Sequence, residues 1–202
     1  MTMSMTTPRQ SPCFIAVEGL DGCGKSTFAR LLAGALGADL LQTPLNLDTA
    51  VRTAMEAHCA RSPLARMMFY GATVVAAAAV IREALAAGRS VVVDRYWLST
   101  VVYHRVMGSP CALEEVANGL PVPDLTAFLH APLEVRFQRI RGRGLTTDAD
   151  RWSLQPELSA RIEALYRELG RRPIAGRFVE IDAGERAPAE LVGAFSWPLT
   201  GP

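Results

Sequence analysis

The chain has 202 residues, half of them hydrophobic, and a formal net charge of +1. This length predicts one domain with a sizeable core. The nearly balanced charge argues against a basic nucleic-acid platform and against a polybasic membrane surface. The four cysteines, at positions 13, 23, 59 and 111, lack C-x-x-C spacing, so we expect reduced thiols in a cytoplasmic protein and neither a zinc site nor a disulfide framework.

Two further stretches bear on targeting and membranes. The apolar run Val74–Ile81 is too short to span a bilayer. Residues 1–12 carry one arginine and no apolar core, which argues against a signal peptide and predicts a mobile N-terminal tail. We expect residues 13–197 to form a single domain that binds neither nucleic acid nor membrane.

Strands and helices are expected to alternate along the chain. The expected strands are 13–18, 39–43, 90–93, 125–129 and 177–181. The expected helices are 27–36, 47–60, 63–87, 97–107, 111–118, one that opens at Pro132, 156–170 and 187–195. The polar, glycine-containing stretch 141–153 predicts a mobile loop. The alternation predicts an α/β fold in which a parallel five-stranded sheet is covered by helices on both faces.

A phosphate-loop motif follows the first strand. Residues 19–27 match G-x-x-x-x-G-K-[ST] in full, between an expected strand and an expected helix. Glycines allow a tight turn close to a polyphosphate, Lys25 would reach its β- and γ-phosphates, and the Ser26 hydroxyl would hold Mg²⁺. The expected ATP-binding residues of the loop are Gly19, Asp21, Gly22, Cys23, Gly24, Lys25, Ser26 and Thr27. The fold class is therefore that of a P-loop NTPase three-layer sandwich. A glycine-rich turn that binds nothing is the alternative, and Lys25 followed by Ser26 argues against it.

A second acidic position stands at the end of the central valine-rich strand. Asp94 would lie near Ser26, because ligands of such sheets sit beyond the carboxyl ends of the strands. Its carboxylate would orient Mg²⁺ or a bound water, and Arg95 would hold a phosphate. The alternative is that Asp94 caps the following helix.

Arginines are concentrated near the expected loop. Arg136, Arg139, Arg141 and Arg143 fall within eight residues, and Arg151 follows. One alternative is a solvated basic face. The other is an Arg-rich lid, over about 141–153, that closes on the nucleotide and neutralises charge on the transferred phosphoryl group.

Together these motifs resemble the thymidylate kinase family over residues 13–183. Residues 14–27 look like its first motif, and Asp94-Arg95-Tyr96 with Ser99, Thr100 and Tyr103 looks like its second. Pro123-Asp124-Leu125, the lid arginines with Asp150-Arg151, and Ile181-Asp182-Ala183 follow in the family's order. The resemblance implies an ATP- and Mg²⁺-dependent nucleoside monophosphate kinase that is a homodimer.

The resemblance also implies roles for single residues. Asp21 would bind the sugar hydroxyl of the acceptor, Arg95 its 5′-phosphate, and Phe69 would stack on a pyrimidine. Thr100 would read the base edge, Tyr103 would pack under the sugar, and Ala183 would lie in the loop that cups adenine. The phosphate loop lacks an arginine after Asp21, so the catalytic arginine would be Arg139, Arg141 or Arg143. The expected acceptor-binding residues are Asp21, Pro44, Arg52, Phe69, Thr73, Arg95, Ser99, Thr100, Tyr103 and Arg151.

Several positions depart from the family's pattern. Gln42-Thr43-Pro44-Leu45-Asn46 replaces Glu-Pro-Gly-Gly-Thr, and Thr73 stands where an arginine is usual. His104 replaces a common glutamine, and the lid is slightly longer between Arg143 and Asp150. Arg52 is the candidate replacement for the missing cation.

These departures leave the acceptor open. It is dTMP, a modified pyrimidine nucleotide, or an unphosphorylated nucleoside or other small molecule, for which Glu18 or Asp94 would serve as base. Two other classes are a GTPase-like switch, which the absence of N-K-x-D argues against, and a non-catalytic nucleotide-binding protein.

Overall fold

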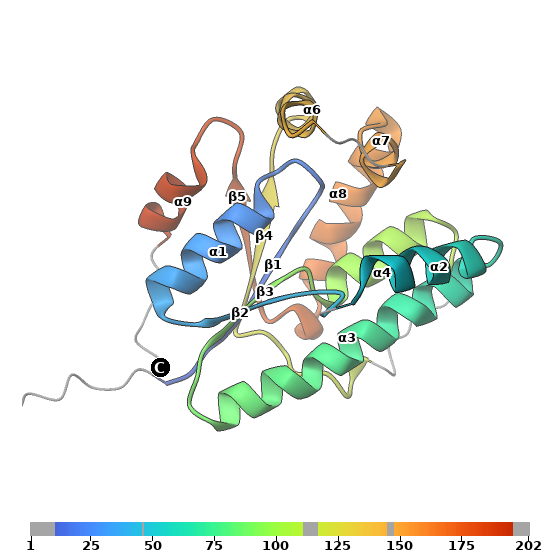
Figure 1. The fold of residues 1–202 in the computed structure, drawn as a ribbon. Coiled ribbons are helices and arrows are strands. Elements are labelled where there is room, and N and C mark those ends of the chain that lie inside the picture. The colour runs from blue at the N-terminus through green and yellow to red at the C-terminus, as the bar shows by residue number, and fades with distance from the viewer. Residues whose placement is uncertain (1–10, 46, 111–116, 145–147, 196–202) are drawn as a thin grey trace, which may run out of the picture.

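The structure is a computed structural model that describes residues 11–45, 47–110, 117–144 and 148–195. In this part of the chain, five parallel strands form one sheet in the order β2-β3-β1-β4-β5, which confirms the expected α/β fold (Figure 1). The strands are β1 Phe14–Gly19, β2 Asp39–Gln42, β3 Val91–Asp94, β4 Leu125–His130 and β5 Arg177–Asp182. Each lies within one residue of its expected position at both ends.

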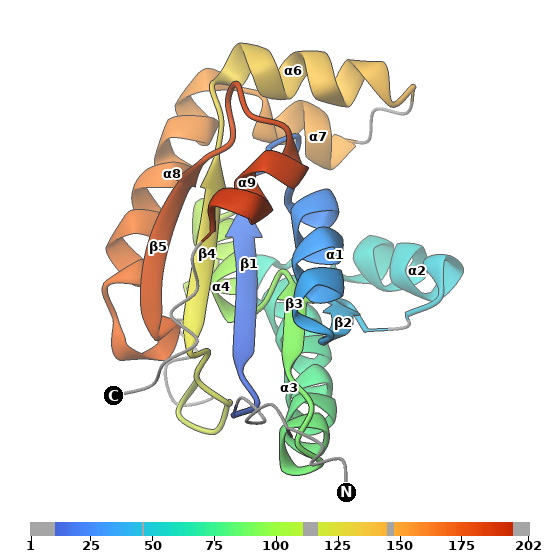
Figure 2. The ribbon, with the colours of Figure 1, turned by 90° about the vertical axis from the view of Figure 1, so that its left-hand side faces the viewer.

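Helices cover both faces of the sheet (Figure 2). α1 (Lys25–Leu36) and α9 (Pro188–Ala194) pack on one face, while α3 (Pro63–Ala86), α4 (Trp97–Val106) and α8 (Pro156–Gly170) pack on the other. All residues of the two central strands β1 and β3 are buried, as expected for strands covered on both faces. Edge strand β2 alternates half-buried and exposed residues.

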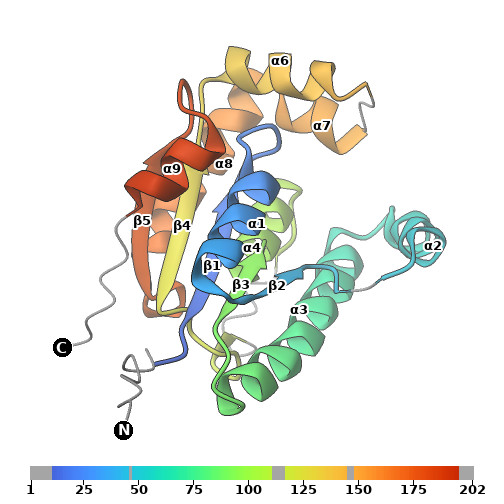
Figure 3. The same cartoon turned by 60° about the vertical axis from the view of Figure 1, so that its left-hand side comes forward.

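The carboxyl ends of the strands meet at one edge. The register pairs Val17 with Asp94 and Gly19 with Leu129, so β1, β3 and β4 end side by side. α6 (Leu133–Gly142) and α7 (Asp148–Ser153) lie over this edge in Figures 1 and 2, whereas α2 (Thr49–Cys59) projects beyond β2 (Figure 3). A short 3-10 turn, η1 (Pro173–Ala175), precedes β5.

Two expectations for local structure were wrong. Residues 141–153 are not one loop, because α6 continues to Gly142 and α7 occupies Asp148–Ser153. The membrane argument considered only Val74–Ile81, whereas helix α3 has 24 residues and includes an 18-residue window with a mean hydropathy of 1.7, enough in length and composition to cross a bilayer. One face of α3, including Met67, Val74 and Ile81, is nevertheless buried in the core.

Some expectations fall outside the described residues. These are the tail up to residue 10, most of the helix expected at 111–118, and residues 145–147 of the lid.

Candidate active site

The phosphate loop joins β1 to α1 at the carboxyl edge of the sheet. β1 ends at Gly19, and α1 begins at Lys25 with Gly24 as its N-cap residue. Gly19 needs its glycine, because a Cβ there would lie 2.2 Å from the Leu129 carbonyl oxygen and its φ is +140°. Ser26 and Thr27 are exposed in the first helical turn. The strand, loop and helix thus have the geometry that the motif predicts for a polyphosphate site.

Lys25, the only lysine in the chain, points back into the loop. Its ammonium donates to the Leu20 carbonyl at 2.7 Å and lies 3.9 Å from the Asp21 carboxylate. Only 6% of its surface is exposed. The loop therefore holds its cation close to the main chain that would surround a phosphate.

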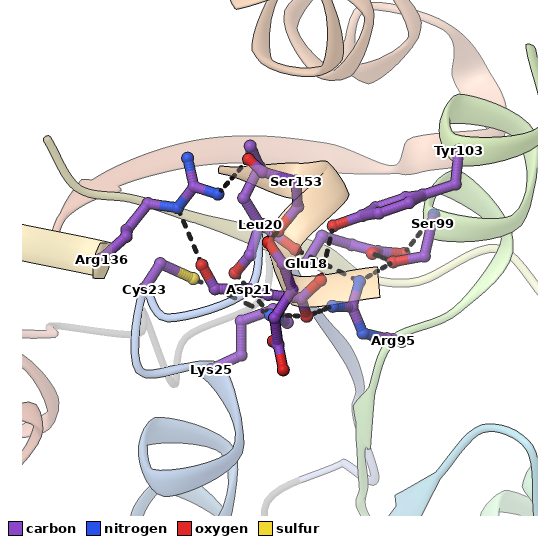
Figure 4. A network of polar contacts seen from close by, with 12 residues as sticks. Glu18, Leu20, Asp21, Cys23, Lys25, Arg95, Ser99, Tyr103, Arg136 and Ser153 are labelled. Carbon is purple, nitrogen blue, oxygen red and sulfur yellow. Dashed lines mark hydrogen bonds and ion pairs between the residues drawn. The ribbon is translucent and has the colours of Figure 1, made fainter. Parts of the chain in front are cut away.

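Asp21 and Arg95 form an ion pair above the sheet edge (Figure 4). Burial alone would raise the pKa of Asp21, but the cations Arg95 and Lys25 outweigh it and lower that pKa. The Tyr103 hydroxyl lies 3.5 Å from the same carboxylate, and the Arg95 guanidinium stands 5.2 Å from the centre of the Tyr103 ring. The structure thus brings together three residues that the sequence assigned to the acceptor.

The backbone of Arg95 adopts a conformation that side-chain-bearing residues rarely take. Its φ is +67°, and it is the only residue other than glycine with a positive φ in the described chain. Such a conformation costs on the order of 1–3 kcal/mol and persists where neighbours enforce it. Thr43 is one such neighbour, since its hydroxyl donates to the Arg95 carbonyl at 3.0 Å and its N–H donates to the Asp94 carbonyl at 3.2 Å.

Buried Glu18 holds the helix that follows Arg95. Its carboxylate accepts from the Tyr96 N–H at 2.9 Å, from the Ser99 N–H at 3.2 Å and from the Ser99 hydroxyl. The Ser99 hydroxyl in turn accepts from Arg95 at 3.2 Å. Burial raises the pKa of Glu18, and hydrogen bonds and Arg95 offset only part of that rise. Ser99, expected to bind the acceptor, therefore links Glu18 to Arg95.

The residues expected at the metal fit a magnesium ion that is shared with phosphates. Asp94 is 3% exposed at the end of β3, and its Oδ1 is buried without a hydrogen-bond partner among the described residues. Ser26 is exposed at the start of α1. The described residues contain no cluster of three or more metal-ligating side chains. One carboxylate and one hydroxyl suit Mg²⁺, which usually keeps waters and phosphate oxygens as its other ligands.

The lid arginines lie in different environments. Arg139 donates to the Cys23 carbonyl at 3.4 Å and to the Gly184 carbonyl at 3.2 Å, so it bridges the phosphate loop and the segment after β5. Arg143 forms an ion pair with buried Asp150, which ties the end of α6 to α7. Arg141 and Arg151 are exposed. Ala183, expected near adenine, is buried beside the Gly184 end of the Arg139 bridge.

Arg136 does not share the environment of the other lid arginines. Its side chain is fully buried and donates to the Asp21 carbonyl, the Ser153 carbonyl and the Ser159 hydroxyl. Neither the solvated basic face nor the mobile lid that the sequence allowed therefore describes Arg136. The face that carries Arg136 and Ile140 points toward the protein interior.

The residues expected to read the acceptor base lie on α3 and α4. Half-buried Phe69 packs edge-to-face with Tyr70 at 5.1 Å, and the Thr73 hydroxyl donates to the Tyr70 carbonyl of its own helix. Thr100 is buried, and its carbonyl accepts from Nδ1 of His104 at 2.7 Å. Thr73 thus adds no cation in place of the missing arginine.

Two buried polar atoms near Tyr70 lack partners in the described chain. They are Nε of Arg66 and Nε2 of His104. The rings of His104 and Tyr70 are 5.4 Å apart, and the Tyr70 hydroxyl donates to Glu56 of α2. Burial, together with the hydrogen bond to Glu56, raises the pKa of Tyr70 to about 12.

The segment that replaces the Glu-Pro-Gly-Gly-Thr motif follows β2 and is described as far as Leu45. Pro44 follows a cis peptide bond directly after Thr43. Arg52 is exposed on α2, close enough to Tyr70 to lower its pKa slightly against the larger effect of burial.

Several residues that build the site were not predicted from the sequence. Glu18 had been considered only as a base, and Thr43 only as part of a departure from the family's pattern. Arg136 stood inside an arginine-rich stretch. Ser159 belongs to a helix with no motif, as does Tyr166, whose hydroxyl lies 2.8 Å from the Ser99 hydroxyl. One signal in the sequence could have indicated that Arg136 is buried. Arg136 and the apolar Ile140 are four residues apart, which places both on the same side of a helix.

Comparisons with known proteins agree with this architecture. The sequence model of the family described as thymidylate kinase matches residues 17–191. A thymidylate kinase of Trichlorobacter lovleyi is 34% identical, with 91% of this chain and 94% of the relative covered. A thymidylate kinase of Cereibacter sphaeroides is 37% identical, with 84% of this chain and 86% of the relative covered.

A solved structure has a similar fold. The thymidylate kinase of Candida albicans superposes with a TM-score of 0.70 at 22% sequence identity, over 91% of this chain and 89% of that one.

Proposed function

The chain belongs to the thymidylate kinase family, and from its site we infer that it transfers the γ-phosphoryl group of ATP to dTMP in a Mg²⁺-dependent reaction. The observation that carries this proposal is the closeness of two cationic positions. Lys25 of the phosphate loop and Arg95 at the end of β3 both face the Asp21 carboxylate. One cation suits the donor polyphosphate and the other suits the phosphate of the acceptor.

The donor half consists of the phosphate loop and its surroundings. Backbone N–H groups of residues 19–25 and the start of α1 would surround the β- and γ-phosphates, with Lys25 as the positive charge. Ser26 and Asp94 would hold Mg²⁺, which neutralises charge on the phosphate oxygens. Arg139, which already bonds the loop at Cys23, is the best-placed lid arginine to neutralise the transferred group.

The acceptor half centres on Arg95. Its guanidinium would bind the acceptor phosphate, and Asp21 and Tyr103 would then contact the sugar. A phosphate oxygen is already ionised, so the transfer needs no side-chain base and depends on positioning and charge. Phe69 and Thr100 would contact the pyrimidine.

A nucleoside acceptor is supported less well. It would need a base, and Glu18 already accepts three hydrogen bonds that hold the start of α4. Asp94 is the remaining candidate, and its expected place at the metal leaves it poorly suited to remove a proton.

Two wider proposals accompany the activity. α3 exposes Leu64, Met68 and Val75 on one side, with 38%, 59% and 46% of their surfaces accessible, and we assign this face to a homodimer. A dimer contact would also account for the apolar character of α3.

The second proposal is that the protein is cytoplasmic. The three described cysteines are free thiols, which suits the reducing cytoplasm.

The test is a coupled assay of ADP release with Mg²⁺-ATP. The acceptors are dTMP, dUMP, dCMP, CMP and the matching nucleosides. We expect dTMP to give the highest kcat/KM. Turnover with nucleosides alone would overturn the proposal, and ADP release that is independent of any acceptor would indicate an ATPase instead.

A further inference from the structure

The Arg136 side chain connects three separate parts of the site. Its Nε donates to the Asp21 carbonyl of the phosphate loop at 2.8 Å. Its Nη1 donates to the Ser159 hydroxyl in α8 at 2.6 Å, and its Nη2 donates to the Ser153 carbonyl at the end of α7 at 2.8 Å. Figure 4 shows the guanidinium between Asp21 and Ser153. One rigid side chain thus fixes the loop relative to the helices that follow the lid.

Among the described residues, no carboxylate is hydrogen-bonded to Arg136. Its three hydrogen-bond acceptors are neutral oxygens, and the side chain is 0% exposed. Burying an ion away from water costs several kcal/mol unless other charges compensate. Arg136 also lowers the pKa of the Asp21 carboxylate, but Arg95 and Lys25 lower it more. Three cations around one carboxylate leave an excess of positive charge that suits a polyphosphate.

The contact with the Asp21 carbonyl also affects the phosphate-binding main chain. That carbonyl belongs to the same peptide group as the Gly22 N–H, one of the loop's donors. A charge-assisted hydrogen bond at the carbonyl polarises the peptide and makes its N–H a stronger donor. α6 is packed tightly at this point, since a Cβ on Gly22 would lie 2.7 Å from the Arg136 carbonyl oxygen.

We propose that Arg136 is a positioning residue for the nucleotide polyphosphate, which acts through the Asp21–Gly22 peptide and anchors the phosphate loop to α7 and α8. This inference rests on the proposed binding of ATP at the loop. It does not depend on the identity of the acceptor.

The test compares four variants of the full-length protein. Arg136→Met removes the charge and all three bonds, Arg136→Lys keeps the charge, and Ser159→Ala removes one anchor while leaving Arg136 in place. Arg161→Met is the matched control, because Arg161 is exposed on α8 two residues from Ser159. Calorimetry measures Mg²⁺-ADP binding, steady-state kinetics measures KM for ATP and for dTMP separately, and thermal unfolding checks the fold.

We expect Arg136→Met to weaken Mg²⁺-ADP binding about tenfold to a hundredfold and to raise KM for ATP while KM for dTMP stays within about twofold. Arg136→Lys should recover part of the loss, Ser159→Ala should weaken binding about threefold, and Arg161→Met should match the wild type.

Unchanged ADP binding in a folded Arg136→Met variant would overturn the inference, as would equal rises in both KM values. If Arg136→Met does not fold, unchanged ADP binding in Ser159→Ala overturns it. The calorimetric measurements need no acceptor, so an inactive wild type that binds Mg²⁺-ADP would contradict the proposed function and leave this inference standing.

Discussion

The Asp21 carboxylate of the phosphate loop is ion-paired with the Arg95 guanidinium, 74 residues later at the end of β3. Arg95 also donates to the Gly19 carbonyl at 3.3 Å and to the Ser99 hydroxyl at 3.2 Å. The pair joins the loop assigned to the donor and the arginine assigned to the acceptor in one hydrogen-bonded unit. An acceptor phosphate would share a guanidinium that is already oriented.

This geometry makes Arg95→Lys informative. A lysine carries the charge but lacks the planar fork that contacts Gly19, Ser99 and Asp21 together. We expect KM for dTMP to rise about tenfold to a hundredfold, with KM for ATP changed by less than about threefold. Initial rates with each substrate varied in turn measure both values. Arg30→Lys, an exposed change on α1, is the control, and an equal rise in both KM values would contradict the assignment of Arg95 to the acceptor.

Lys25 allows a labelling experiment that few proteins permit. Because it is the only lysine, an acyl-phosphate derivative of ATP has one side-chain amine to acylate. We expect mass spectrometry to find the label on Lys25 and excess Mg²⁺-ATP to prevent it.

Lys25→Met should lose the label and lower kcat by about a hundredfold to a thousandfold, because a preorganised charge at the transferred phosphate is removed. Labelling of the N-terminal amine is the internal control. Acylation of Lys25 that ATP does not compete would place the nucleotide elsewhere.

Glu18 predicts a pH dependence of stability. Its pKa is raised in the folded protein, so the native state binds more protons than the unfolded state above pH 4.5, and the free energy of unfolding falls as the pH rises through the folded pKa. Glu18→Gln cannot ionise and should lose this dependence. Denaturant unfolding of both proteins from pH 4.5 upward measures the difference. A wild-type stability that rises relative to Glu18→Gln over this range would contradict the raised pKa.

His104 predicts selectivity for the base. Its Nδ1 faces the Thr100 carbonyl and therefore carries the proton of the neutral ring, which leaves the buried Nε2 as an acceptor. Burial lowers the pKa of His104, so the ring is neutral at pH 7. An acceptor atom favours the N3–H of thymine over the unprotonated N3 of cytosine.

We expect His104→Leu to lower the ratio of kcat/KM for dTMP to that for dCMP about tenfold. His58→Leu, an exposed change on α2, should leave the ratio unchanged. An unaltered ratio in the His104 variant would remove His104 from base recognition.

The exposed face of α3 predicts the assembly state. Met68→Glu places a charge on the side chain that is 59% exposed at the middle of the apolar stripe. We expect sedimentation velocity to show a dimer for the wild type and a monomer for this variant. Leu31→Glu, at a position on α1 that is 37% exposed, is the matched control and should remain dimeric. A monomeric wild type would rule out the proposed interface.

The sequence alone determined the parts of this protein that depend on near neighbours. The phosphate loop and the five strands follow from glycine positions and from apolar runs a few residues long. These features are local, because a tight turn or a buried strand is set by the residues within it. The parallel direction of the strands follows from the alternation of strands and helices, whereas their order β2-β3-β1-β4-β5 is known only from the structure.

Only the tertiary structure decided which side chains surround the site. Arg136 bonds Asp21 across 115 residues, and Thr43 bonds Arg95 across 52. An arginine-rich stretch predicts an exposed face, because burial of a guanidinium is costly when its partners are unknown. The carbonyls of Asp21 and Ser153 and the Ser159 hydroxyl compensate that cost here, and they meet only when β1, α6, α7 and α8 are packed together. The same reason explains why Glu18 and Ser99 hold the helix after Arg95, a role that no spacing in the sequence indicates.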